Sequence, residues 1–133
     1  MTRGQRLNNL GNIRIGKPVF FGEVVPGSDS EFRQFDTVEN GIRAIGKILL
    51  AYFNVHGLNT IREIIGRWAP PADNNPTDAY ISNVAEGTGL DADAVLQPTQ
   101  DIIQGITTAI IKQEQGEPAQ LADVSAGVGR LFA

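Results

Sequence analysis

The chain has 133 residues, of which 41% are hydrophobic and 20% are charged, a balance typical of one globular domain rather than of a disordered segment. It contains no cysteine, which excludes disulfides and thiolate chemistry, and its formal net charge of −4, without a long basic run, disfavours nucleic-acid binding. The first residues lead into no apolar segment, and the longest apolar run, residues 48–53, is too short to cross a bilayer. We therefore expect a single domain over residues 1–133, with no signal peptide, no transmembrane segment and no membrane partner.

Residues 1–35 have the pattern of turns and short strands. Polar and apolar residues alternate over residues 13–15 and 32–35, and a second β-like run covers residues 19–25. The sequence Pro-Gly-Ser-Asp at residues 26–29 is a turn signal between them. This pattern predicts a small N-terminal β-hairpin or sheet.

Helical periodicity begins at Asp36, which is followed by Glu39 in a capping-box pattern. Apolar residues then recur every three or four positions, as on one face of a helix. Helix-capping residues and prolines divide the rest of the chain into further helical segments. Helices are predicted over residues 36–56, 60–69, 75–90, 99–115 and 119–132, with Asp36, Thr60, Asn75 and Thr99 as caps. The predicted fold class is mainly α (α+β), a small N-terminal β-hairpin or sheet followed by four or five helices.

Few residues have the spacing of a known catalytic or metal-binding motif. His56 is the one histidine, and its position beside Gly57 is typical of a helix end, whereas zinc sites and catalytic triads need more partners. Asp91 and Asp93, and the cluster at residues 73–75, lack the spacing of a calcium-binding loop and are typical of turns. We expect no metal and no cofactor.

Carboxylate chemistry remains possible, because glycoside cleavage needs one protonated carboxyl group and a second carboxylate or a bound water. Glu114 lies at the end of the most apolar helix, and Glu23 lies beside two phenylalanines in a β-like segment. On the pattern alone, either residue is more typical of a surface glutamate.

An ordered series of motifs suggests a family. It consists of Asn-Asn-Leu-Gly-Asn-Ile-Arg at residues 8–14, Phe-Gly at residues 21–22 and Phe-Arg-Gln-Phe-Asp-Thr-Val-Glu-Asn-Gly-Ile-Arg at residues 32–43. The series resembles that of flagellar-type N-acetylglucosaminidases of the lysozyme-like superfamily. It is still more similar to a group of small phage and prophage proteins, usually described as virion or structural proteins, with the start Asn-Asn-Pro-Gly-Asn-Ile-Arg. That likeness continues through residues 56–60, residues 67–71 and Tyr80, and covers residues 3 to about 116. Leu10 stands where those proteins have proline, and Phe21 where they usually have tryptophan.

The resemblance implies a lysozyme-like fold. In the glucosaminidases the catalytic glutamate lies on a helix before the hairpin, but almost nothing precedes Asn8 here. The phage relatives have a His-Glu-Asn-Gly segment near the C-terminus, which corresponds to Gln-Glu-Gln-Gly at residues 113–116. We therefore predict a circular permutation that moves the acid helix to the end of the domain and packs it against the hairpin.

The resemblance also implies roles for individual residues. Glu114 would be the general acid, Glu23 the second carboxylate, and Tyr80 a residue of the substrate cleft. Asn9 and Asn12 would shape the hairpin or donate hydrogen bonds to a sugar amide, and Trp68 would be a sugar platform. For Tyr80 and Trp68, a place in the hydrophobic core is the alternative.

The predicted function is cleavage of peptidoglycan glycan strands by a phage-type glycosidase or lytic transglycosylase, virion-borne or acting at lysis. The alternative is a non-catalytic virion or tail component that uses the same fold to bind murein or neighbouring subunits. The expected partners are peptidoglycan glycan strands and other virion proteins. The expected location is the virion, or the host cytoplasm before lysis.

Overall fold

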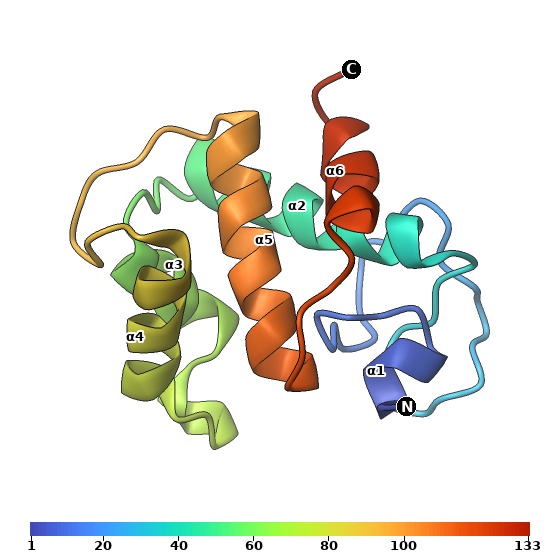
Figure 1. The fold of residues 1–133 in the computed structure, drawn as a ribbon. Helices are drawn as coiled ribbons and strands as arrows, with labels where there is room; N and C mark the ends of the chain where they lie inside the picture. Colours follow the sequence, from blue (N-terminus) through green and yellow to red (C-terminus); the bar gives the residue numbers. More distant parts are fainter.

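The computed structural model describes residues 1–133 and is built from helices (Figure 1). The helices are α1 (Arg3–Arg6), α2 (Val38–Asn54), α3 (Ile61–Trp68), the short 3-10 helix η1 (Pro71–Asp73), α4 (Thr77–Thr88), α5 (Gln100–Gln115) and α6 (Leu121–Gly129). None of these helices has the length and apolar character needed to cross a membrane.

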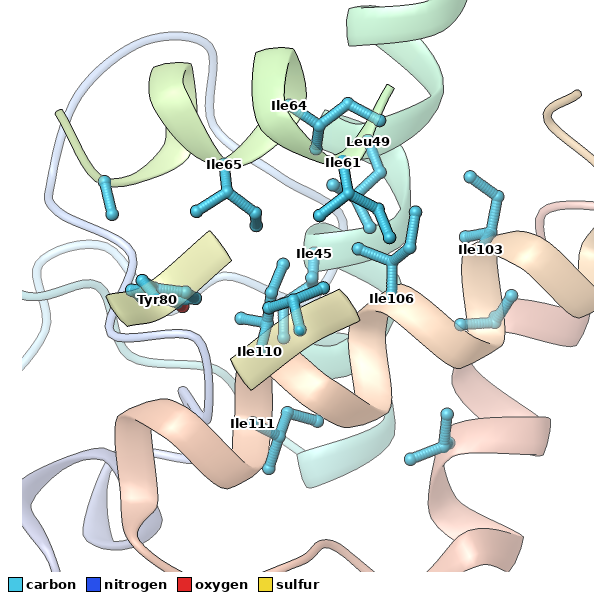
Figure 2. Packing of buried hydrophobic residues seen from close by; sticks show 14 of the residues in the cluster. Ile45, Leu49, Ile61, Ile64, Ile65, Tyr80, Ile103, Ile106, Ile110 and Ile111 are labelled. Atoms are coloured by element: carbon cyan, nitrogen blue, oxygen red, sulfur yellow. The ribbon is translucent and has the colours of Figure 1, made fainter. Parts of the chain in front are cut away.

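Helix α5 stands in the middle of the molecule and contacts α2, α4 and α6 (Figure 1). α3 packs on α4 at one side, and α6 packs on α2 at the other. The apolar faces of α2, α3, α4 and α5 meet in one core rich in isoleucine (Figure 2). Its fully or almost fully buried members include Ile45, Leu49, Ile61, Ile64, Ile65, Tyr80, Ile103, Ile106, Ile110 and Ile111. Burial of each large apolar side chain contributes about 1.5–3 kcal/mol, so the contacts along α5 hold the helices on both sides of it together.

The predicted N-terminal β-hairpin or sheet is wrong. Residues 1–35 contain no strand and only two isolated bridges, Arg14 to Phe32 and Glu23 to Phe35. The α+β, lysozyme-like arrangement and the circular permutation based on that hairpin are therefore replaced by an all-helical fold with an irregular N-terminal segment.

Side chains, together with a few backbone hydrogen bonds at the two bridges, hold the irregular segment in place. The buried Asn9 amide donates to the carbonyls of Ile13 and Arg33, at 2.9 and 2.8 Å, and accepts from the Ile13 N–H. Pro18 and Pro26 supply no N–H for a ladder. The segment thus satisfies its backbone groups without forming a sheet.

Two predicted helix caps are confirmed. The Thr60 hydroxyl accepts from the Glu63 N–H at the start of α3, and the Thr99 hydroxyl accepts from the Ile102 N–H at the start of α5. Each bond satisfies a backbone donor that the first helical turn leaves unpaired.

Two other predicted caps are wrong. α2 is capped by Thr37, whose hydroxyl accepts from the Asn40 N–H, whereas the Asp36 carboxylate accepts from the Asn40 side chain at 2.8 Å. α4 begins after Pro76 without a side-chain cap, and the Asn75 amide donates backwards to the Pro70 carbonyl at 3.0 Å.

Candidate ligand-binding site around Glu114

The C-terminal end of α5 meets the loop of residues 8–12 and the first turn of α4 at Glu114. One oxygen of the Glu114 carboxylate accepts from the Asn12 side-chain amide at 3.0 Å. The other accepts from the Tyr80 hydroxyl at 2.8 Å. Two donors from distant parts of the sequence therefore hold this carboxylate in one orientation.

Gln115, the neighbour of Glu114, ties α5 to the same loop. Its buried side chain donates to the Leu10 carbonyl at 2.7 Å and lies 3.3 Å from the Asn12 side-chain oxygen. Its oxygen accepts from the Thr2 hydroxyl. Because each of these bonds joins the two ends of the chain, Gln115 fixes the loop that carries Asn12. Gln115 could not be predicted from the sequence, since a glutamine in a last helical turn has no distinguishing pattern.

Tyr80 is 2% exposed and belongs both to the hydrophobic core and to this site (Figure 2). Burial, the nearby Glu114 charge and the hydrogen bond to Glu114 together raise the pKa of Tyr80 far above its ordinary value. The hydroxyl therefore keeps its proton, which it donates to Glu114.

A pocket of about 330 Å³ opens beside the Glu114 carboxylate, within the range of about 300–1,000 Å³ common for ligand sites. The polar groups in its wall include Asn12, Asp73, Asn75 and Glu114. Trp68 supplies a half-buried aromatic face. Carboxylates, amides and an aromatic face can bind a ligand that carries hydroxyl or amide groups and an apolar side.

The structure brings four of the residues singled out in the sequence into this neighbourhood: Glu114, Tyr80, Asn12 and Trp68. It adds the exposed carboxylate of Asp73, which the sequence analysis assigned to a turn. A turn aspartate has no local signal that it faces a pocket formed by other elements.

The remaining two residues lie elsewhere. Asn9 is fully buried and bonds only to backbone groups of its own segment. The Glu23 side chain is 4% exposed and forms an ion pair with the 5% exposed side chain of Arg33 at 2.5 Å, outside the wall of the Glu114 pocket. In this arrangement Asp73, and not Glu23, shares a pocket with Glu114.

Comparison with known proteins agrees with the phage kinship that the sequence motifs suggested and gives no support for membership of the lysozyme-like superfamily. No family model matches the chain. The chain is 37% identical over 118 residues to protein P5 of Pseudoalteromonas phage PM2, a match that covers 86% of this chain and 72% of that protein. The chain therefore belongs to the phage protein family that includes protein P5 of Pseudoalteromonas phage PM2.

Proposed function

We propose that this protein is a component of a phage virion, where it contacts other virion proteins. The observation that carries the proposal is the 37% identity to a phage protein over 86% of this chain. The motif series at residues 8–43, similar to that of small phage proteins described as structural, supports it. The continuous hydrophobic core also suits a particle component, because a chain of this length with such a core can fold without disulfides.

The test is the protein composition of purified particles of the phage that encodes the chain. We expect peptides of this chain to sediment with the particles, at a constant ratio to the major capsid protein after repeated gradient purification and a high-salt wash. A phage-encoded protein of DNA replication serves as the control and should be lost. Recovery of the chain only in the particle-free lysate would contradict a virion role.

A second candidate function, binding or cleavage of peptidoglycan glycan strands, is favoured by the pocket that Glu114, Asn12 and Trp68 line together, with the Tyr80 hydroxyl donating to Glu114. Glu114 would give a proton to the glycosidic oxygen, with Asp73 as the second carboxylate in the same wall. This chemistry depends on the carboxyl pair and not on a particular fold. Each Glu114 oxygen accepts one hydrogen bond in the structure and keeps a second lone pair that can bind a proton.

Substitution of Glu114 by glutamine tests this candidate, because glutamine keeps the shape of the side chain but cannot deliver a proton. If Glu114 is the general acid, release of reducing ends from purified peptidoglycan should fall by about 10²-fold or more. Glu86→Gln is the matched control, since Glu86 is exposed on α4 and its side chain forms no hydrogen bond or ion pair. Equal release of reducing ends by Glu114→Gln and Glu86→Gln would exclude Glu114 as the general acid. If the wild-type protein is retained on peptidoglycan but releases no reducing ends, binding is left as the function of the pocket.

A further inference from the structure

A second cavity, distinct from the Glu114 pocket, lies between the segment of residues 17–21 and helix α2. Its volume is about 520 Å³, again within the range of about 300–1,000 Å³ for small-molecule sites. Four of the chain's 11 lysine and arginine residues line it, and no aspartate or glutamate does. Such a concentration of positive charge is unexpected in a chain with a net charge of −4, and we call this cavity the basic groove.

Three of the four cations in the basic groove have no negative partner. Arg33 is neutralised by its buried ion pair with Glu23. Lys17, Arg43 and Lys47 form no ion pair. The groove therefore presents about three uncompensated positive charges to a ligand, enough to attract an anion that carries more than one charge.

Arg43 is the best-placed of these cations. It projects from the middle of α2 with its guanidinium stacked on the Phe21 ring, 4.4 Å from the ring centroid. Its Nε atom is buried and has no hydrogen-bond partner in the protein. A buried donor without a partner is destabilising, and an oxygen of a bound anion would accept its hydrogen bond. The stacked, planar guanidinium is already oriented for such a contact.

The other part of the groove is apolar. Val19 is 59% exposed and Phe21 is 65% exposed, while Phe20, Ile48 and Tyr52 are half-buried in the wall. Large apolar side chains that stay this exposed beside a cavity gain free energy when a ligand covers them. A ligand that complements the whole groove thus has an anionic head and an apolar body.

We propose that the basic groove binds a phosphate group attached to an apolar chain. A phosphate monoester has a charge of about −1.5 to −2 at neutral pH and three acceptor oxygens, which match the uncompensated charges and the free donors of Arg43 and the two lysines. The apolar chain lies on Val19 and the phenylalanines. Neither the phage kinship nor the Glu114 pocket is needed for this assignment.

The test is calorimetric titration of the whole chain with octyl phosphate below its micelle-forming concentration, inorganic phosphate and 1-octanol. We expect saturable binding of octyl phosphate that weakens as sodium chloride is raised, because exposed charges are screened. We expect binding at least about tenfold weaker for inorganic phosphate and for octanol, since each lacks one half of the ligand. Inorganic phosphate or octanol binding as tightly as octyl phosphate would overturn the proposal, and so would absence of saturable binding.

Two pairs of variants locate the site. Arg43→Gln and Lys47→Gln should each weaken octyl phosphate binding, Arg43→Gln by about tenfold or more, because a hydrogen bond to a charged group is lost. Arg6→Gln and Lys112→Gln are the controls, since both side chains are exposed, lie outside the groove and form no ion pair. Lys47 is exposed, so its variant tests the proposal even where Arg43→Gln is unstable. Equal binding by Lys47→Gln and Lys112→Gln would overturn the assignment.

Discussion

Substitution of Gly41 by alanine is expected to prevent folding or to destabilise the protein by more than about 4 kcal/mol, the range of the most disruptive core changes. A Cβ atom on Gly41 would lie 1.9 Å from the Asn8 carbonyl oxygen and 3.3 Å from the Phe35 ring. Neither the backbone at Gly41 nor the backbone at Asn8 can move away easily. Gly41 is in the first turn of α2, and Asn8 is held at a φ of 54° while its amide donates to the Phe35 carbonyl at 3.1 Å. Urea unfolding, monitored by circular dichroism, measures the change in the free energy of unfolding.

Gly66→Ala is the matched control. Gly66 is inside α3, and a Cβ atom there would meet nothing within 4 Å. Alanine should therefore stabilise the protein by about 0.5–1 kcal/mol, the ordinary gain in a helix interior. An unfolding midpoint for Gly41→Ala equal to that of the wild type would show that α2 does not lie against the loop of residues 8–12.

The helices after residue 36 could be predicted from the sequence because their signals are local. An apolar residue at every third or fourth position identifies the buried face of a helix, and threonines such as Thr60 and Thr99 mark its start. Pro70 and Gly116 mark helix ends for equally local reasons, because proline restricts the residue before it and glycine tolerates the left-handed conformation.

The N-terminal segment could not be predicted because its stabilising contacts are not local. Alternation at residues 13–15 and 32–35 is typical of strands, and the Arg33 N–H does donate to the Ile13 carbonyl and the Ile15 N–H to the Glu31 carbonyl, but the pairing extends no further than this one bridge. Asn8 and Asn12 adopt positive φ values of 54° and 51°, which break any regular strand. No pattern over a few residues shows that the backbone pairing stops after single bridges and that the buried Asn9 side chain binds the adjacent carbonyls.

The last helix shows how tertiary packing overrides propensity. Gly127 argues against a helix by propensity, yet it lies inside α6. A Cβ atom there would meet the Glu39 carbonyl oxygen at 2.7 Å and the Ile42 Cβ at 2.9 Å, so glycine allows α6 to approach α2 closely. The sequence alone does not show the neighbouring helix that makes a glycine favourable.

The candidate site was reached through the resemblance rather than through residue patterns. Glu114 and Tyr80 are 34 positions apart, and only the packing of α4 on α5 brings their side chains to 2.8 Å. The short helix η1, which precedes α4, contributes Asp73 to the pocket wall. Periodicity could assign Tyr80 to a buried helix face, but it could not show that its hydroxyl meets a carboxylate.

Substitution of Glu23 by glutamine is expected to destabilise the protein by about 3–5 kcal/mol, because it leaves the buried Arg33 charge without a partner. The Arg33 guanidinium also donates to the carbonyls of Arg14 and Pro18, both at 2.8 Å, so it cannot turn outward without breaking these bonds. Glu23 in turn accepts from the Phe20 N–H at 3.1 Å. The pair therefore joins three stretches of the irregular segment that no strand ladder connects.

Asp93→Asn is the control for the loss of Glu23, since Asp93 forms an exposed ion pair with Arg62 at 2.7 Å. Exposed pairs contribute little and are screened by salt, so the stability of Asp93→Asn should be close to that of the wild type. Urea unfolding in 0.1 and 1 M sodium chloride separates the two cases, because salt screens a buried pair much less. The loss in the free energy of unfolding caused by Glu23→Gln should persist in 1 M sodium chloride. The loss of stability in Glu23→Gln could instead be no larger than that in Asp93→Asn, or could disappear in 1 M sodium chloride. Either result would mean that Glu23 and Arg33 are solvated and do not hold the N-terminal segment together.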